Sequence, residues 1–360
     1  MDDRVPVSLI TGCLGSGKTT LLNRLLANRA MSDTAVIINE FGEIGLDHLL
    51  VTTPTETTVL LEDGCICCTV RGDLVQTLVG LYKRRGAGGL PPFRRVVIET
   101  TGLADPVPII QTVATDEQAA RVYRLDTVVT LVDAVHGSAQ IDAQDEALKQ
   151  IGVADRIVLT KTDIADAQSV AALRDRIVSI NPGAAVLTAV HGVVDARELF
   201  GAGLASGAHD PEHFSRWLRH EAYVAASAPE HARHRHGGIQ AFAAMYEQPI
   251  TGSGFATWLT LLASLRGPQL LRCKGLLNIE GRPVAVHAVQ TVIHEPVELE
   301  RWPDDDRRSR LVFITRGLGR EEIERTFDAF RLAIPRVEGA PRTIDPAQYA
   351  QFLDAARRFR

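Results

Sequence analysis

The sequence predicts an α/β protein, with a mostly parallel sheet covered by helices on both faces, followed by a smaller α+β domain. Short β-branched runs alternate with longer segments of helical spacing over the first two hundred residues. This alternation is typical of parallel strands joined by helices. A Gly-, Ala- and Ser-rich stretch, Gly201–Gly207, then marks a boundary. The length of 360 residues also exceeds what one hydrophobic core normally serves.

The first domain is predicted to span residues 1–205 and to contain strands separated by helices. The β-branched runs predict strands at Val7–Ile10, Ala35–Ile38, Val96–Ile98, Thr127–Val132, Arg156–Leu159 and Ala185–Leu187. Apolar residues spaced three or four positions apart predict helices at Thr19–Ala30, Arg71–Arg84 and Val170–Ile180.

A different pattern follows the boundary. Residues 206–237 are rich in histidine and are interpreted as a linker. Residues 238–335 are predicted to form the α+β domain, and residues 336–360 a tail that contains a helix. The expected elements are a strand at Ile239–Tyr246, a helix at Phe255–Leu265, a hairpin around Glu280–Pro283, a strand at Leu311–Thr315, and helices at Arg320–Leu332 and Gln348–Phe359.

The composition excludes several classes of protein. With 45% apolar and 23% charged residues, a net charge of −5 and no long basic run, nothing indicates nucleic acid or an anionic membrane as a partner. No apolar stretch is long enough to span a membrane, and the N-terminus is too short and acidic for a signal peptide. Three of the five cysteines lie within four positions, which favours reduced thiols and a cytoplasmic location.

A phosphate-binding motif lies between the first strand and the first helix. Its eight residues match G-x-x-x-x-G-K-[ST] in full: Gly12, Cys13, Leu14, Gly15, Ser16, Gly17, Lys18 and Thr19, with Thr20 counted in the same site. Glycines let the backbone N–H groups curl around phosphate oxygens. Lys18 is expected at the β- and γ-phosphates and the Thr19 hydroxyl on Mg²⁺. The alternative is a glycine-rich turn that matches by chance.

An acidic residue ends the strand Val96–Ile98, and a glycine follows three residues later. Glu99 is expected to hold Mg²⁺ directly or through water, and the N–H of Gly102 to sense the γ-phosphate. Most strands of this kind end in Asp rather than Glu. The alternative interpretation is a solvent-facing carboxylate at a strand end.

A second nucleotide motif follows the strand Arg156–Leu159. Thr160 and Lys161 are followed by Asp163, whose carboxylate can accept from both the N1–H and the 2-amino group of guanine. Adenine offers no such pair of donors, so the motif predicts GTP rather than ATP. The usual first residue of this motif is Asn, and a Lys-x-Asp on a protein surface is also common.

A dense cysteine segment lies between the two phosphate motifs. In an extended segment Cys65 and Cys67 would project to one side, and Cys68 can join them after a local bend. Three thiolates suit Zn²⁺, or less selectively Co²⁺, and leave one coordination position open. The fourth ligand could be Glu40 or Glu43, a histidine or water. The alternatives are buried structural cysteines or a redox pair.

The histidine-rich stretch and the two isolated cysteines are the remaining features. The histidine-rich stretch runs from His209 to His236, and His231, His234 and His236 form either a second metal feature or part of a polar linker. Cys13 and Cys273 are interpreted as packing residues.

The order of these motifs resembles that of the CobW-like GTPases. The likeness rests on the P-loop, Asn39-Glu40-Phe41-Gly42, Gly64-Cys65-Ile66-Cys67-Cys68, the run from Glu99 to Pro106 and Thr160-Lys161-Thr162-Asp163, and it extends to Cys273-Lys274-Gly275 through Gly317-Leu318. The resemblance implies a GTPase that binds Zn²⁺ or Co²⁺ and serves as a metallochaperone or metal-insertion factor for a client metalloenzyme. It does not identify the metal or the client, and a homo-oligomer remains open.

Two other classes of protein are alternatives. A small-molecule kinase would use the same P-loop but needs an acceptor pocket and usually a basic lid, and no arginine-rich lid is seen near the motif. A passive zinc-binding interaction protein would not need the intact set of Lys18, Thr19 and Glu99.

Overall fold

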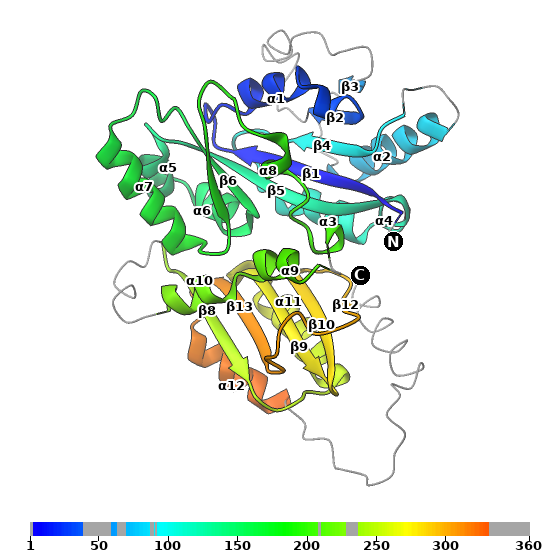
Figure 1. The fold of residues 1–360 in the computed structure, drawn as a ribbon, viewed down its shortest axis with the longest axis vertical. Coiled ribbons are helices and arrows are strands. Elements are labelled where there is room, and N and C mark those ends of the chain that lie inside the picture. Colours follow the sequence, from blue (N-terminus) through cyan, green and yellow to red (C-terminus); the bar gives the residue numbers. More distant parts are fainter. Residues whose placement is uncertain are drawn as a thin grey trace. The chain divides into compact units, whose positions relative to one another are not determined.

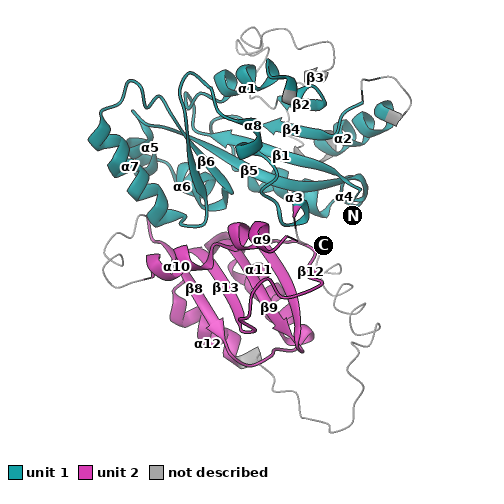
Figure 2. Ribbon diagram, viewed as in Figure 1, with its two compact units in different colours: residues 1–206 teal, residues 207–360 magenta. Residues whose placement is uncertain are grey.

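A computed structural model of the protein describes residues 3–38, 59–62, 70–86, 90, 92–207, 210–227 and 237–330. The chain divides into two compact units, residues 1–206 and 207–360 (Figure 2). Within the described ranges, no helix has the length and apolar character needed to cross a membrane.

The first unit is built on a seven-stranded sheet with the order β3-β2-β4-β1-β5-β6-β7 (Figure 1). Every neighbouring pair of strands is parallel. The strands are β1 (Val5–Gly12), β2 (Thr34–Ile38), β3 (Val59–Glu62), β4 (Arg95–Glu99), β5 (Tyr123–Asp133), β6 (Arg156–Thr160) and β7 (Ala185–Ala189). The predicted fold class and all six predicted strands are confirmed. The additional strand, β3, was not expected because its four residues are too short to show an alternation.

Helices connect these strands. They are α1 (Lys18–Leu26), α2 (Val70–Gly86), α3 (Val107–Thr115), α4 (Glu117–Val122), α5 (Gly137–Ala143), α6 (Asp145–Val153), α7 (Ala167–Ile180) and α8 (Ala196–Leu199). Helix α1 ends four residues before its predicted end, and a 3₁₀ turn, η1 (Arg29–Met31), follows. A further 3₁₀ turn, η3 (Leu204–Ser206), closes the unit. The short helices α3 to α6 were not predicted, since six to nine residues give little periodicity.

Helix α1 is held by one apolar face. Leu21, Leu22, Leu25 and Leu26 are each at most 4% exposed and pack in one cluster with Ile10 of β1. Burial of a leucine side chain contributes roughly 1.5–3 kcal/mol. This face therefore fixes the helix that carries Lys18 at its first position.

The second unit contains a six-stranded sheet with the order β11-β10-β9-β13-β8, and β12 pairs with β10. All of its strand pairs are antiparallel. The strands are β8 (Ile239–Tyr246), β9 (Leu270–Ile279), β10 (Arg282–Val289), β11 (Val292–Ile293), β12 (Val297–Glu298) and β13 (Ser309–Arg316). The helices are α9 (Pro211–Leu218), α10 (His220–Ala226), α11 (Gly252–Arg266) and α12 (Arg320–Phe330), with a 3₁₀ turn, η4 (Gly267–Gln269).

Most predicted elements of this unit are confirmed. Strand β8 has the predicted bounds, and the predicted hairpin joins β9 to β10 through Glu280 and Gly281. Their φ angles of 53° and 92° lie in the left-handed region that a two-residue hairpin turn uses. Strand β9 was not predicted, because it is buried along its whole length and shows no alternation. The tail helix at 348–359 lies outside the described residues.

One face of this sheet packs against α11 and α12. Trp258 is 1% exposed, and its ring meets the Phe327 ring edge-on with a centroid distance of 4.9 Å. Cys273 is fully buried in the same cluster, as its interpretation as a packing residue requires. Burial raises the pKa of the Cys273 thiol, so this cysteine stays protonated.

Part of the segment that was interpreted as a linker is helical and belongs to the second unit. Helix α9 contacts β9, where the Lys274 ammonium donates to the Trp217 carbonyl oxygen at 3.0 Å and lies 4.9 Å from the centre of the Trp217 ring. His213 lies on α9 and His220 on α10. His209, His231, His234 and His236 lie outside the described residues.

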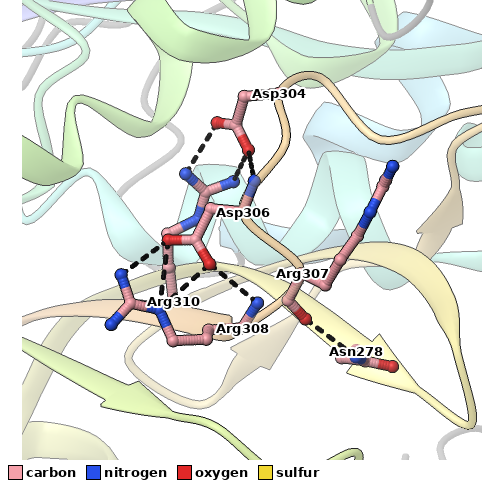
Figure 3. Close-up of polar contacts among 6 residues, drawn as sticks. All are labelled: Asn278, Asp304, Asp306, Arg307, Arg308 and Arg310. Carbon is pink, nitrogen blue, oxygen red and sulfur yellow. Dashed lines mark hydrogen bonds and ion pairs between the residues drawn. The ribbon is translucent and has the colours of Figure 1, made fainter.

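Ion pairs order the loop that leads into β13 (Figure 3). Asp304 accepts from Arg310 at 2.7 and 3.0 Å, and Asp306 accepts from Arg308 at 2.9 Å. Asn278 of β9 donates to the Arg307 carbonyl oxygen at 2.8 Å. The hydrogen bonds from Arg308 lower the pKa of Asp306 from its ordinary value of 3.8 to about 2.

Candidate nucleotide site

The loop between β1 and α1 has the geometry that its motif predicts. Gly12, Gly15 and Gly17 have φ angles of 142°, 77° and 91°, which favour glycine. A side chain at Gly12 is also excluded by space, because its Cβ would lie 2.4 Å from the Leu131 carbonyl oxygen. The strand, glycine turn and helix N-terminus together form a cradle for phosphate.

Lys18 is directed into this loop. Its side chain is buried, and its ammonium donates to the carbonyl oxygens of Gly12 and Cys13 at 2.9 and 3.1 Å. Ser16 is also fully buried in the loop, whereas Leu14 is 72% exposed. Thr19 lies half-buried in the first turn of α1, and the next residue, Thr20, is exposed. A phosphate held by the loop would meet both the Lys18 ammonium and the Thr19 hydroxyl.

Glu99 lies beside this loop. It is aligned with Ile10 of β1 and with Ile38 of β2, at the carboxyl ends of all three strands. Its side chain is buried, at 6% exposure of the residue, so the alternative of a solvent-facing carboxylate is wrong. The following residue anchors the segment, since the Thr100 hydroxyl donates to the Thr11 hydroxyl at 2.8 Å.

Gly102 packs directly on the phosphate loop. A Cβ at this position would lie 2.4 Å from the Leu14 backbone nitrogen and 3.0 Å from the Cys13 carbonyl carbon. Glycine is therefore required by a close backbone approach, which brings the segment after β4 against the loop.

Helix α6 joins the same two segments, a link that the sequence analysis missed. The buried Gln150 accepts from the Cys13 thiol at 3.8 Å and donates to the Ala104 carbonyl oxygen at 3.1 Å. One residue earlier, Lys149 pairs with Asp105 at 3.2 Å. Burial raises the pKa of the Cys13 thiol, so Cys13 acts here as a neutral donor. No motif in the sequence singles out α6.

The Thr-Lys-x-Asp motif lies at the end of β6, next to the phosphate loop. The buried Thr160 hydroxyl donates to the Ser16 carbonyl oxygen at 2.8 Å, and a Cβ added at Gly17 would lie 3.8 Å from the nearest Thr160 side-chain atoms. Thr160 therefore braces the loop from the neighbouring strand. Asp163 is more accessible, with 29% of its side chain exposed, and His191 lies 3.7 Å from its Oδ2.

Asp133 is a second residue that the sequence analysis missed. It ends β5, is 1% exposed, and accepts from the Lys161 ammonium at 2.8 Å. Asp133 directly follows the predicted strand Thr127–Val132, as Glu99 follows Val96–Ile98, so the same pattern could have identified it.

These residues meet because all the strands of the sheet are parallel. Their carboxyl ends lie at one edge, where open α/β sheets bind ligands. The structure brings together the phosphate loop, Glu99, Gly102 and the Thr-Lys-x-Asp motif at that edge.

Glu40, Glu43, Cys65, Cys67 and Cys68 all lie outside the described residues. Among the residues that are described, no group of three or more His, Cys, Asp and Glu side chains is placed to hold a metal ion.

Comparisons with known proteins cover both units. Residues 6–188 match the family model described as CobW/HypB/UreG, nucleotide-binding domain. Residues 239–331 match the model described as cobalamin synthesis protein cobW C-terminal domain.

Several curated relatives are similar over most of the chain. The zinc chaperone YjiA of Escherichia coli is 35% identical over 91% of this chain and 99% of its own length. The zinc chaperone CobW of a Sinorhizobium species is 30% identical over 86% of this chain and 92% of its own. The zinc-regulated GTPase metalloprotein activator 1 of Schizosaccharomyces pombe is 35% identical over 54% of this chain and 47% of its own.

A solved structure agrees with the fold. The crystal structure of the Zn(II)-bound YjiA GTPase from E. coli matches 91% of this chain and 99% of that chain, with a TM-score of 0.71 and 31% identity. The resemblance inferred from the motifs is thus confirmed, and so is the predicted enzyme class, a GTPase, at the level of the family. The chain belongs to the CobW/HypB/UreG family of nucleotide-binding proteins, in the form that carries a CobW C-terminal domain.

Proposed function

We propose that this protein is a GTP-hydrolysing metallochaperone, which carries Zn²⁺ on its cysteine segment and delivers it to a client protein in a nucleotide-dependent way. One observation carries the proposal. Strands β2 and β3 end at Ile38 and Glu62, at the same sheet edge as Glu99 and the phosphate loop. The chain leaves these strands two residues before Glu40 and three before Cys65. The names of the relatives, zinc chaperone and zinc-regulated GTPase, support the same function.

The phosphate end of the site fits Mg²⁺ and a nucleoside triphosphate. The Thr19 hydroxyl and the buried Glu99 carboxylate are oxygen ligands of the kind that Mg²⁺ prefers. Thr19 lies in the first turn of α1, which follows β1, and Glu99 ends β4, which pairs with β1. Lys18 would bind the β- and γ-phosphates, and the N–H of Gly102 would contact the γ-phosphate. Bound Mg²⁺ supplies charge neutralisation on those phosphates.

The reaction is the attack of water on the γ-phosphate, which yields GDP and inorganic phosphate. The residues proposed here bind the phosphates and orient them, and none of them is an obvious base for the attacking water. We therefore expect slow basal hydrolysis until a metal or a partner completes the site.

The base end of the site is proposed to select guanine. The partly exposed Asp163 carboxylate can accept hydrogen bonds from the N1–H and the 2-amino group of guanine. Thr160, in the same motif, is hydrogen-bonded to the phosphate loop. Because the Thr160 hydroxyl donates to the Ser16 carbonyl oxygen, we propose that Thr160 stabilises the phosphate loop and does not contact the base.

The cargo site is proposed to be Cys65, Cys67 and Cys68, with Glu40 or Glu43 as the fourth ligand. Thiolates suit Zn²⁺ best, and Co²⁺ is an alternative cargo. Ligation requires deprotonated cysteine, so metal affinity should fall as the pH falls.

The test is a Zn²⁺ titration of the full chain with GDP, with a non-hydrolysable GTP analogue and without nucleotide. We expect the two nucleotides to change the zinc affinity by about 5- to 150-fold relative to each other, the range of coupling energies of 1–3 kcal/mol. Equal zinc affinity in both states would leave a GTPase without chaperone coupling.

Matched variants locate the zinc. Cys67→Ser should lose the nucleotide-dependent binding, whereas Cys273→Ala should keep it because Cys273 is buried in the other unit. Stoichiometry must be measured as well, since a YjiA variant with one glutamate and two cysteines replaced by alanine is also described as Zn(II)-bound.

The partner is proposed to be a client metalloenzyme. Transfer is tested by incubating the zinc-loaded chain with an apo-metalloenzyme and GTP, and a homo-oligomer is tested by light scattering of the GDP and GTP-analogue forms.

A further inference from the structure

We infer that Asp133 is a positioning residue for the guanine site, because its carboxylate holds Lys161 so that the lysine stem covers the face of the base. The inference rests on the proposed guanine site at Asp163 and adds a residue to it.

Asp133 is held in one orientation. Its Oδ1 accepts from the backbone N–H groups of Val135 and His136, at 2.8 and 3.3 Å. Its Oδ2 accepts from the Lys161 ammonium at 2.8 Å. Both carboxylate oxygens are hydrogen-bonded and 1% of the side chain is exposed, so these bonds hold the Asp133 carboxylate in place.

The pair also holds Lys161. A buried carboxylate is costly unless a cation compensates it, so the ammonium is drawn to Asp133. The Lys161 side chain is 36% exposed, so a bound ligand can reach it while its ammonium is paired with the buried Asp133. Its backbone has a φ of 57°, a left-handed conformation that is uncommon for a residue other than glycine.

The position of Lys161 in the motif suggests what its stem does. Thr160, one residue before it, contacts Ser16 of the phosphate loop, and Asp163 lies two residues after it. In the inferred pose, a nucleotide with its phosphates in the loop and its base edge on Asp163 passes beside Lys161, which lies between Thr160 and Asp163 in the chain. The stem of Lys161 then packs on the face of the base while its ammonium stays on Asp133.

This arrangement divides the recognition of guanine into two parts. Asp163 forms hydrogen bonds with the edge of the base and so selects which base is bound. Lys161 contacts the face, which all purines share, and Asp133 sets its position. Loss of the Asp133 charge should therefore weaken every purine nucleotide but not a ligand that occupies the phosphate loop alone.

The test compares GDP with inorganic pyrophosphate, both with Mg²⁺, on the full chain. Asp133→Asn keeps an acceptor for the two N–H groups and removes the charge. We expect it to weaken GDP about tenfold, the equivalent of 1.4 kcal/mol, and to change pyrophosphate affinity by less than about twofold. Equal weakening of both ligands would show a structural role only, and unchanged GDP affinity would overturn the inference.

A second variant guards against misfolding. Lys161→Met keeps an apolar stem and removes the ammonium, and it should also weaken GDP more than pyrophosphate. The double variant, Asp133→Asn with Lys161→Met, should bind GDP about as tightly as the single variant with the lower affinity, because both changes break the same interaction. Additive losses would show that the two residues act separately, against the inference.

Two controls complete the experiment. Asp142→Asn removes a carboxylate that pairs with Arg176 on α7 of the same unit, and it should leave GDP affinity unchanged. Asp163→Asn, measured with xanthosine diphosphate, tests the proposed site itself. If Asp163→Asn does not gain affinity for xanthosine diphosphate, the proposed guanine site is refuted. If it gains that affinity but Asp133→Asn leaves the GDP affinity unchanged, only the positioning role of Asp133 is refuted.

Discussion

The Thr160 hydroxyl donates a hydrogen bond to the Ser16 carbonyl oxygen at 2.8 Å, across 144 positions of the chain. The bond joins the end of β6 to the phosphate loop, so the motif proposed for the base and the motif proposed for the phosphates are braced against each other.

Loss of this brace should weaken the phosphate loop. For Thr160→Val, which is similar in shape, we expect GDP and pyrophosphate to weaken together by about fivefold, corresponding to about 1 kcal/mol for one hydrogen bond. Thr160→Ser keeps the hydroxyl and is the control. Equilibrium titration of both ligands measures the effect, and a loss confined to GDP would assign Thr160 to the base instead.

Removal of the Lys18 ammonium should abolish hydrolysis. Lys18→Ala takes away the charge held at the loop carbonyl oxygens, and we expect GTP hydrolysis to fall by more than about a hundredfold. Phosphate release measured under single-turnover conditions reports the rate. Parental activity in this variant would refute the assignment of the loop.

Base choice should change with Asp163. In Asp163→Asn the acceptor pair becomes a donor and an acceptor, which suits xanthine better than guanine. We expect the ratio of kcat/KM for GTP over xanthosine triphosphate to invert. A ratio equal to the parent's would place guanine recognition elsewhere.

The link through α6 should contribute to both stability and hydrolysis. Gln150→Leu leaves the Ala104 carbonyl oxygen without this donor, and we expect the free energy of unfolding to fall by about 1–3 kcal/mol. Hydrolysis should fall as well, because Gly102 and Ala104 lie in the segment against the loop. Gln140→Leu is a milder comparison, since Gln140 donates to Leu14 from an exposed position at 3.4 Å. Thermal unfolding and phosphate release measure the two effects; unchanged hydrolysis would confine Gln150 to stability.

The second unit should lose stability in acid through Asp306. Its pKa is about 2 in the folded chain and 3.8 ordinarily, so its contribution is complete above about pH 5 and disappears as the pH falls from about 4 to 2. We expect about 1 kcal/mol from this group, after allowance for solvent screening. Asp306→Asn should flatten this part of the stability profile, and Asp305→Asn, at an exposed neighbouring residue, is the control.

Tryptophan fluorescence measures this effect in the second unit alone, because Trp217, Trp258 and Trp302 all lie there. An acid profile that is the same in the parent and in Asp306→Asn would show that the Arg308 pair contributes nothing measurable.

The sequence by itself determined the local features of this protein. The glycines at 12, 15 and 17, the acid after Val96–Ile98 and the alternation of strands with helices are encoded within a few neighbouring residues. Such features can be predicted from local backbone preferences and from the periodicity of apolar residues.

Only the tertiary structure decided which of these features touch. Thr160 reaches Ser16, Lys161 reaches Asp133, and Gln150 reaches both Cys13 and Ala104. These contacts depend on the order β4-β1-β5-β6, which places strands distant in sequence side by side. The spacing of residues along the chain does not predict the strand order, because the order results from the packing of the whole sheet against its helices.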